Sequence, residues 1–465
     1  MKYIIIKAED LNDIIIDESI LNKNISISKG VCFIEYKNKN YFLFKSIPDE
    51  ELLHWIYSFY KKLILVAILE DDLFFDKIFN TISYSQSINQ NESIVIEFLE
   101  KILLNSLKQG ASDIHFENQY NRLLIKIRLD GVLIHIDSID NKKISEQIIS
   151  RIKVLSNLDI AEQRIPQDGR LSLDISDVSI DLRISIMPGM HGEDAVLRIL
   201  DKSNLSTDEK KLSLEKLGFD EESINKLNRL AANPYGMILF TGPTGSGKTT
   251  SLYSLIQETT AITNKIITIE DPIEYKISNA LQIPVNEKKG LTFAKGLRSI
   301  LRHDPDTILI GEIRDKETAE IAIQAALTGH LVYSSVHANT ALDVIGRFRH
   351  MGVDLYGFLN SLTGIVAQRL IRINCVFCFS IEHKKSIGCD KCFYTGYKGR
   401  KAIIEILFID DTLREFIINN TSTAKIKEYL IKKGMKTLRV QGLENVKNNV
   451  TTIIELDRVT QNEIN

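Results

Sequence analysis

The chain has 465 residues, of which 44% are hydrophobic and 26% are charged, and its formal net charge is −3. This length is enough for roughly two to four domains with their own cores, and the balanced charge argues against a protein that binds nucleic acid through a basic surface. The start "MKYIIIKAEDLND" has its acids too early for a secretory signal peptide, and the apolar run at residues 63–69 is far shorter than the roughly 20 residues that cross a bilayer. We therefore expect a soluble, cytoplasmic protein with no transmembrane segment.

Residues 1–90 are expected to form a small α/β module. Short apolar runs such as "YIIIKA" and "GVCFIEY" precede a helical stretch around "DEELLHWIYSFYKKL". The module carries no chemical motif that we can assign, and the lone Cys32 is expected to be a core residue. The polar stretch at residues 86–93 is expected to be a linker.

Residues 94–205 are expected to form a second domain around an antiparallel sheet. A helical segment ending at Gly110 is followed by alternating stretches such as "LLIKIRLDG" and "SIDLRISIMPG". This alternation predicts strands with one buried face, joined by turns. Arg128 and Arg183 have apolar neighbours in these strands and are therefore expected on the opposite, polar face, with Arg198 as a third candidate.

Residues 206–218 lie in a polar, charged stretch and are expected to be a linker to the next domain. In residues 219–410, apolar runs such as "GMILFTG" and "TILIGEIR" alternate with helical segments. This pattern predicts an α/β domain whose parallel sheet is covered on both faces. Residues 411–465 are expected to be helical.

A phosphate-binding loop follows the first of these apolar runs. The pattern G-x-x-x-x-G-K-[ST] is matched in full by Gly242, Pro243, Thr244, Gly245, Ser246, Gly247, Lys248 and Thr249, and Thr250 follows. Such a loop points backbone N–H groups at phosphates, and the next helix adds its positive end. Lys248 is expected to reach the β and γ phosphates of ATP, and the Thr249 hydroxyl to ligate Mg²⁺. The strand before and the helix after disfavour a chance glycine turn.

Two acidic segments are candidates for the chemistry of hydrolysis. In "LRHDPDTILIGEIRD", Glu312 follows an apolar strand, where a carboxylate can orient or deprotonate the water that attacks the γ phosphate. Many phosphate-loop enzymes have a magnesium-binding aspartate just before this glutamate, but this chain has Gly311. The best substitute is "ITIEDPIEY", which ends another predicted strand with Glu270, Asp271 and Glu274. The alternative is that these acids lie on a solvated loop.

Two histidines, His330 and His337, flank the apolar strand in "TGHLVYSSVHANTA". They could sense the γ phosphate or relay a signal between sites. Their spacing leaves open the alternative that they are ordinary surface or core residues.

Four of the five cysteines form two C-x₂-C pairs, Cys375 with Cys378 and Cys389 with Cys392. Two such pairs can close a tetrahedral zinc site that leaves no open position, so we expect a structural Zn²⁺ within a loop at residues 372–400. The alternative is four ordinary buried cysteines. His383 lies between the pairs and is expected on the loop surface.

Together, the phosphate loop, the two acidic segments and the histidine segment resemble those of the type II secretion and type IV pilus assembly ATPases. Stretches such as "GASDIHFE", "RIPQDGR" and "TGYKGRKAIIEIL" extend the resemblance over about residues 95–410. It implies a homo-hexameric ring of RecA-like ATPase domains, each linked to a PAS-like α+β domain and carrying a small zinc-binding insert. Such rings are peripheral at the inner membrane, where they drive a platform protein that assembles pilin or pseudopilin subunits.

The resemblance also implies roles for individual residues. It makes Glu312 the catalytic base, places Glu270 in an acidic box and places His330 and His337 in a histidine box. For Arg128 and Arg183 it implies catalytic arginines at the cleft between domains, whereas a solvated sheet face is the alternative for any single arginine. Many relatives have Thr-Leu-His-Thr-Asn where this chain has "SSVHAN", so Ser335 and Ala338 leave the geometry of phosphate sensing open.

The cysteine loop favours the assembly or secretion branch over pilus-retraction ATPases, which lack it. A nucleic-acid translocase is the main alternative function, but the chain has no basic stripe with interleaved aromatic residues. A nucleotide-binding scaffold without activity ranks last because both Lys248 and Glu312 are present.

Overall fold

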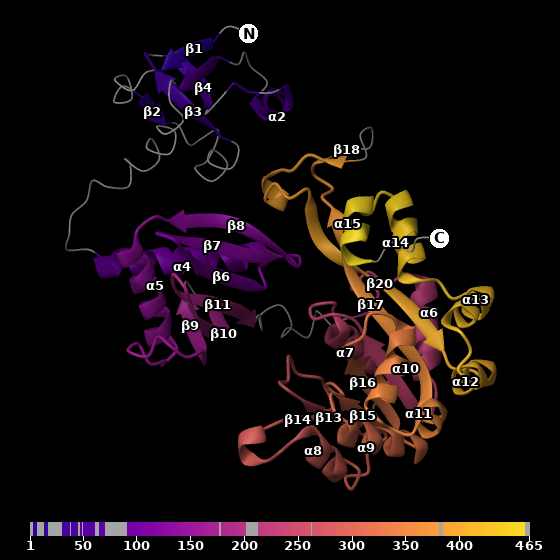
Figure 1. Cartoon of the computed structure of the whole chain (residues 1–465). Coiled ribbons are helices and arrows are strands. Elements are labelled where there is room, and N and C mark those ends of the chain that lie inside the picture. Colours follow the sequence, from indigo (N-terminus) through magenta and orange to yellow (C-terminus); the bar gives the residue numbers. More distant parts are fainter. Residues whose placement is uncertain are drawn as a thin grey trace. The chain divides into compact units, whose positions relative to one another are not determined.

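The computed structural model describes residues 3–6, 14–16, 30–37, 39–44, 47–48, 50–60, 65–69, 91–175, 178–200, 213–261, 263–380 and 385–460. The chain divides into two compact units, Met1–Ile199 and Leu200–Asn465, which Figure 1 draws with their elements labelled. Most of the two expected linkers and His383 lie outside the described residues.

Among the described residues, the first part of the N-terminal unit shows a mixed sheet with one helix. Its strand order is β1-β5-β4-β3-β2. Its elements are β1 (Tyr3–Ile6), β2 (Ile14–Ile16), β3 (Val31–Tyr36), β4 (Lys39–Phe44), α2 (Glu50–Tyr60) and β5 (Val66–Leu69). The rings of Phe33, Phe42 and Tyr60 pack together and join the sheet to α2. Cys32 is fully buried, which confirms its prediction as a core residue.

The second part of this unit is a six-stranded sheet in the order β8-β7-β6-β11-β10-β9. Its elements are α4 (Asn91–Gln109), β6 (Asp113–Gln119), β7 (Arg122–Leu129), β8 (Val132–Ile139), α5 (Lys142–Leu155), β9 (Gln167–Ile175), β10 (Val178–Gly189) and β11 (Gly192–Leu200). The predicted antiparallel pairing is confirmed for β6 with β7 and β11, for β7 with β8 and for β9 with β10. Alternate residues of these strands form an apolar core with α4 and α5.

The C-terminal unit is built on a seven-stranded sheet in the order β14-β13-β15-β16-β12-β17-β20. Its strands are β12 (Gly236–Thr241), β13 (Ile266–Glu270), β14 (Ala280–Pro284), β15 (Thr307–Ile310), β16 (Leu331–Val336), β17 (Leu362–Asn374) and β20 (Tyr397–Phe408), with a small pair formed by β18 (Phe379–Ser380) and β19 (Lys385–Ser386). Its helices are α6 (Glu221–Ala231), α7 (Lys248–Thr259), α8 (Phe293–Ile300), α9 (Lys316–Leu327), α10 (Ala341–His350), α11 (Leu355–Ser361), α12 (Asp411–Ile418), α13 (Thr423–Lys432), α14 (Leu438–Lys447) and α15 (Ile453–Val459).

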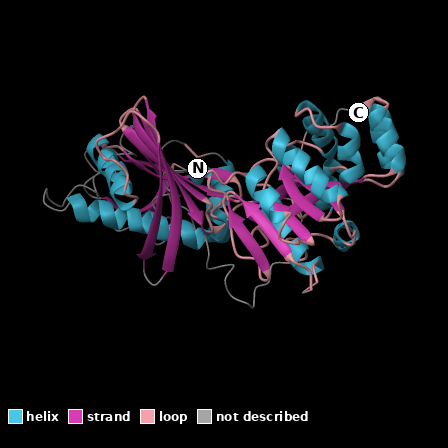
Figure 2. Ribbon diagram, turned by 90° about the horizontal axis from the view of Figure 1, so that it is seen from below, coloured by secondary structure: helices cyan, strands magenta, loops and turns pink. Residues whose placement is uncertain are grey.

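Both faces of this sheet are covered, as the apolar runs predict. Met237 and Leu239 of β12 belong to a core that includes α8 and α9, whereas Ile238 and Phe240 belong to a core that includes α6 and α7. Figure 2 shows the helices gathered around the strands. The pairs from β14 to β17 are parallel, which confirms the expected parallel sheet.

One edge of the sheet differs from the expectation of parallel strands. Strand β20 pairs antiparallel with β17, from Gly364–Phe408 to Asn374–Tyr397. The connection between them is the cysteine loop, which returns the chain beside β17 so that β20 runs in the opposite direction. The two strands run side by side toward this loop (Figure 1). The four helices after β20 confirm the expected helical C-terminal region.

Candidate functional site

The phosphate-loop sequence lies between a buried strand and a helix, as predicted. Strand β12 ends at Thr241 and α7 begins at Lys248. Gly247 precedes the helix with a φ of 83°, in the left-handed region that favours glycine. The free N–H groups of the first turn of α7 and the loop therefore lie at the carboxyl edge of the sheet, where open α/β sheets bind ligands.

Lys248 is held inside the loop that it follows. Its side chain donates to the carbonyl oxygens of Gly242 (2.8 Å) and Pro243 (3.1 Å), and the residue is only 8% exposed. Burial and, to a smaller extent, the charge of Arg369 lower the pKa of Lys248 to about 8, although Glu312 opposes the shift. An ammonium held by two neutral carbonyls can exchange them for phosphate oxygens, which are stronger partners.

Glu312 and His337 reach the same edge from two neighbouring strands. Glu312 follows β15 and pairs with Arg314, and its Oε2 lies 3.5 Å from Nε2 of His337, which follows β16. Burial and the charge of Lys248 lower the pKa of His337. The structure thus brings together Lys248, Glu312 and His337, which the sequence singled out separately.

Hydroxyl groups fix the backbone on which these residues stand. Ser335 donates to the carbonyl of Gly311 (2.7 Å), the residue before Glu312. Thr241, the last residue before the phosphate loop, donates to the carbonyl of Ala338 (2.9 Å) and accepts from its N–H (2.9 Å). Ser335 therefore holds the segment that carries Glu312, and Ala338 contributes through its backbone.

Gly311 also has a steric reason to lack a side chain. A Cβ at this position would lie 3.3 Å from Cα of Glu270 and 3.4 Å from the carbonyl oxygen of Ile269 on the adjacent strand β13. The first contact is tight, so an aspartate at position 311 would require β13 to shift by a few tenths of an ångström. The chain accordingly has no acid directly before Glu312.

The three acids of the β13 segment lie in different surroundings. The Glu270 carboxylate is 2% exposed and accepts hydrogen bonds from Tyr253, from Thr268 (2.6 Å) and from Gln282 (3.2 Å). Asp271 and Glu274 are exposed. Because three neutral donors occupy Glu270, a magnesium ion would have to displace them to bind it directly.

The structure does not bring His330 to the phosphate loop, contrary to the expectation for a histidine box. The residue precedes β16, and its carbonyl accepts from the N–H of Gly236 at the start of β12. The loop lies at the other end of these strands, about 20 Å away at 3.3 Å per residue. Nδ1 of His330 lies 2.9 Å from the carbonyl oxygen of Ala325, which closes the end of α9.

The arginines of the six-stranded sheet lie on its polar face, as their neighbours predict. Arg198 and Arg128 both approach the buried Asp113, at 2.9 Å and 3.6 Å. Although burial raises the pKa of Asp113, its contacts with Arg198, Ser112 and Arg128 lower it overall. Arg183 differs, because its buried Nε has no hydrogen-bond partner among the described residues.

The four cysteines come together at the end of the β17–β20 hairpin. Their sulfur atoms all lie within 4.8 Å of one another. Sγ separations are 3.8 Å for Cys375–Cys389, 3.8 Å for Cys378–Cys392 and 3.7 Å for Cys389–Cys392. Four thiolates at about 2.3 Å from one ion have edges of about 3.8 Å, so this cluster is compatible with tetrahedral zinc.

Comparisons with known proteins show the family of this chain. Residues 89–458 match the family model described as Type II/IV secretion system protein. The chain belongs to this family. The type II secretion system ATPase E of Vibrio cholerae is 41% identical over 406 residues, covering 82% of this chain and 79% of that protein. The type II secretion system protein HxcR of Pseudomonas aeruginosa is 38% identical and covers 90% and 89%.

Two solved structures share the fold of this secretion-family protein. The pilus retraction motor PilT with bound ADP has 26% identity and a TM-score of 0.51, covering 78% of this chain and 97% of PilT. The ATPase DotB of Legionella pneumophila has 20% identity and a TM-score of 0.59, covering 78% and 95%. This chain is therefore a mixed α/β secretion ATPase. No helix among its described residues is long and apolar enough to span a membrane.

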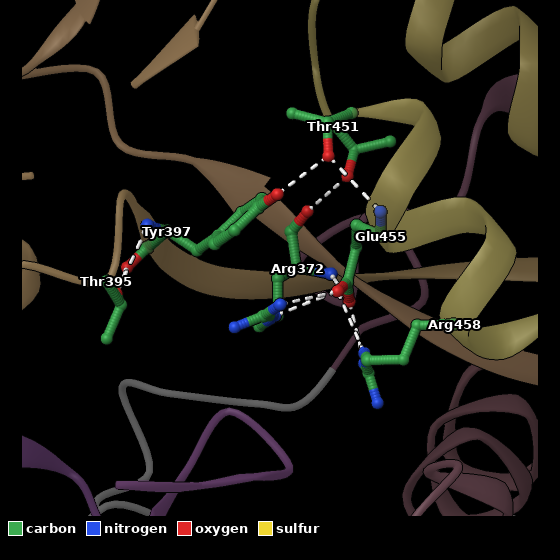
Figure 3. A network of polar contacts seen from close by, with 7 residues as sticks. Arg372, Thr395, Tyr397, Thr451, Glu455 and Arg458 are labelled. Atoms are coloured by element: carbon green, nitrogen blue, oxygen red, sulfur yellow. Dashed lines mark hydrogen bonds and ion pairs between the residues drawn. The ribbon is translucent and has the colours of Figure 1, made fainter. Parts of the chain in front are cut away.

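A buried ionic network at the base of the cysteine loop is a feature that sequence reasoning missed (Figure 3). Glu455 of α15 is fully buried and accepts hydrogen bonds from Arg372 of β17 and from Arg458. Although burial raises the pKa of Glu455, these hydrogen bonds lower it overall. Arg372 also lies 4.1 Å from the ring centre of Tyr397 on β20. The network joins α15 to the two strands that flank the cysteine loop.

Proposed function

We propose that this secretion ATPase is the subunit of a homo-hexameric motor that powers assembly of a pilus or pseudopilus filament at the inner membrane. The observation that supports this most strongly is the convergence of Lys248, Glu312 and His337 at the carboxyl edge of the parallel sheet. In this proposal the protein is cytoplasmic and associates with the membrane through a platform protein.

The proposed chemistry assigns a task to each group at this edge. The loop from Gly242 to Thr250 binds the triphosphate of ATP through backbone N–H groups, and Lys248 pairs with the β and γ phosphates. The Thr249 hydroxyl would hold Mg²⁺, which supplies positive charge to the phosphates. Glu312 orients and deprotonates the attacking water. His337, close to both Lys248 and Glu312, would respond to the γ phosphate.

Glu270 is proposed to act beside this group. It ends β13, which lies next to β15. The neighbouring Asp271 contributes to raising the pKa of Arg314, the ion-pair partner of Glu312. A contribution of Glu270 to the magnesium shell would require its hydrogen bonds to rearrange or to include a bridging water.

We further propose that the C-terminal unit is a RecA-like domain and the six-stranded sheet belongs to a PAS-like domain. In a ring, Arg128 and Arg183 would stabilise the charge that develops on the γ phosphate. The unpartnered Nε of Arg183 supports this role, because a buried guanidinium nitrogen without a partner is costly unless something binds it.

For the cysteine cluster we propose one structural Zn²⁺ bound by Cys375, Cys378, Cys389 and Cys392. Elemental analysis of the purified chain should give about one Zn²⁺ per chain, and Cys389→Ser should abolish it. Cys32→Ala is the matched control, because Cys32 is buried in the N-terminal sheet. A folded wild-type chain without metal would contradict the zinc assignment.

The experiment that tests the proposed function is a pull-down from native membranes with the Glu312→Gln variant. This variant should bind ATP without splitting it and should retain a membrane platform protein when ATP is present. Lys248→Ala, which cannot hold the triphosphate, is the control and should retain much less. Recovery of nucleic acid instead of a membrane protein would contradict the motor for filament assembly and favour a translocase.

A further inference from the structure

Strand β17 places Gln368 directly against the phosphate loop. The register pairs Thr241, the end of β12, with Ala367, so the next residue of β17 lies where the loop leaves the sheet. The Gln368 side chain is 1% exposed, and its Nε2 donates to the backbone carbonyl of Ser246 at 2.8 Å. This hydrogen bond connects the middle of the loop to a strand on the rigid sheet.

The loop has glycine at the two positions that approach Gln368 most closely. A Cβ at Gly247 would lie 3.0 Å from Gln368 Nε2, and a Cβ at Gly242 would lie 2.5 Å from the Gln368 carbonyl oxygen. Both glycines also have positive φ values. The side chain and the backbone of one residue therefore contact both ends of the loop.

Two polar atoms at this contact are buried without a hydrogen-bond partner among the described residues. They are Oε1 of Gln368 and Oγ of Ser246. An unpaired buried acceptor costs free energy, and the Gln368 amide carries this cost together with its hydrogen bond to the Ser246 carbonyl. The hydrogen bond from Nε2 is therefore the polar contact through which this side chain acts on the loop.

The backbone of Gln368 is tied to the segment that follows His337. Arg369 donates to the carbonyl of Gln368 at 3.1 Å and to the carbonyl of Asn339 at 2.7 Å. The strand can thus hold the phosphate loop in a fixed position relative to the His337 segment.

We propose that Gln368 is a positioning residue that holds the Ser246–Gly247 part of the phosphate loop in the shape that accepts a triphosphate. The inference rests on the phosphate-binding role proposed above. When Lys248 exchanges its two carbonyl partners for phosphate oxygens, Gln368 keeps the Ser246 carbonyl in place. Because the loop is ordered before binding, the effect falls on nucleotide affinity and not on the chemical step.

The test compares Gln368→Met with the full-length wild-type chain. Methionine has a similar shape but cannot donate to the Ser246 carbonyl. We expect the KM for ATP and the Kd for ADP to rise about tenfold, while kcat at saturating ATP changes less than about threefold. In Gln368→Asn the amide is too short to reach the carbonyl, so KM should again rise while kcat changes little. This variant replaces Gln368→Met in the test if the methionine variant does not fold.

The matched control is Gln441→Met. Gln441 is another buried glutamine of this unit, and it donates to Ser223 at 3.1 Å, a residue of α6. This substitution should lower the thermal midpoint without changing the KM for ATP. An unchanged KM in Gln368→Met, or equal KM shifts in both methionine variants, would overturn the inference. If Lys248→Ala also bound ATP normally, the proposed function itself would fail.

Discussion

The phosphate loop and the base of the cysteine loop both contact strand β17, but their polar groups are paired in different ways. At the phosphate loop, Lys248 donates to two neutral carbonyls, and buried atoms of Ser246 and Gln368 have no partner among the described residues. At the base of the cysteine loop, both oxygens of Glu455 accept hydrogen bonds from arginine side chains (Figure 3).

The phosphate loop must exchange its hydrogen-bond partners when nucleotide binds, whereas the base of the cysteine loop must keep the partners that it has. Neutral carbonyls release an ammonium at low cost when a triphosphate arrives, whereas a buried carboxylate with two arginines is expensive to open. Substitutions in the first region should therefore change activity with little change in stability, and substitutions in the second should do the reverse.

The largest effect is expected from Glu455→Ala. It leaves Arg372 beside a buried space without its anion, so the free energy of unfolding should fall by about 3–5 kcal/mol. Chemical denaturation measures this loss, and the KM for ATP of the folded fraction should stay unchanged. Glu428→Ala, which removes an exposed ion pair with Lys432, is the control and should have no measurable effect. If Glu455→Ala had the same free energy of unfolding as the wild type, the network at the base of the cysteine loop would not be needed for stability.

Lys248→Ala should have the next largest effect, and it should be confined to activity. Loss of the ammonium should lower kcat/KM for ATP at least about 100-fold, or roughly 3 kcal/mol of transition-state stabilisation. Phosphate release and the thermal midpoint should be measured on the same preparation. A large fall in the midpoint would show that Lys248 is a structural residue, as Glu455 is.

Arg183→Ala should lower kcat by about tenfold or more and leave nucleotide affinity nearly unchanged, because a catalytic arginine acts on the transition state. Arg122, an exposed residue of the same sheet paired with Asp140, provides the control Arg122→Ala. If the Arg183 variant kept its full ATPase rate, this arginine would not belong to the site.

The smallest effect is the dependence of ATP affinity on pH. The pKa of Lys248 is about 8, so the lysine is charged below this pH and loses its charge above it. Phosphate binding favours the charged form, and the KM for ATP should therefore rise above pH 8 by up to about tenfold per pH unit. In Lys248→Arg the charge persists, so its KM, although higher, should be flat. A wild-type KM that is constant to pH 9.5 would contradict this prediction.

Local sequence patterns were sufficient for part of the site. The phosphate loop was predictable because its strand, glycines and helix are adjacent in the chain. The clustering of the four cysteines was likewise predictable, because the two C-x₂-C pairs lie close together in the chain. Glu312 was predictable as the acid that follows an apolar strand at the edge of a parallel sheet.

Contacts between distant segments were not predictable. Gln368 is 122 residues from Ser246, and Glu455 is 83 residues from Arg372. The polar pair "QR" within the apolar run "GIVAQRLIRI" was the only signal for Gln368. His330 does not lie at the phosphate loop as expected, because the residues before and after a strand lie at its opposite ends. His337 follows β16 and reaches the loop, whereas His330 precedes β16.

The most direct test of the account is a paired measurement on Glu312→Gln with Mg²⁺ and ATP. Glutamine keeps the shape of the side chain but cannot deprotonate water, so phosphate release should fall at least about 100-fold while ATP binds within about threefold of wild-type affinity. A Glu312→Gln chain that releases phosphate at the wild-type rate would contradict the central claim.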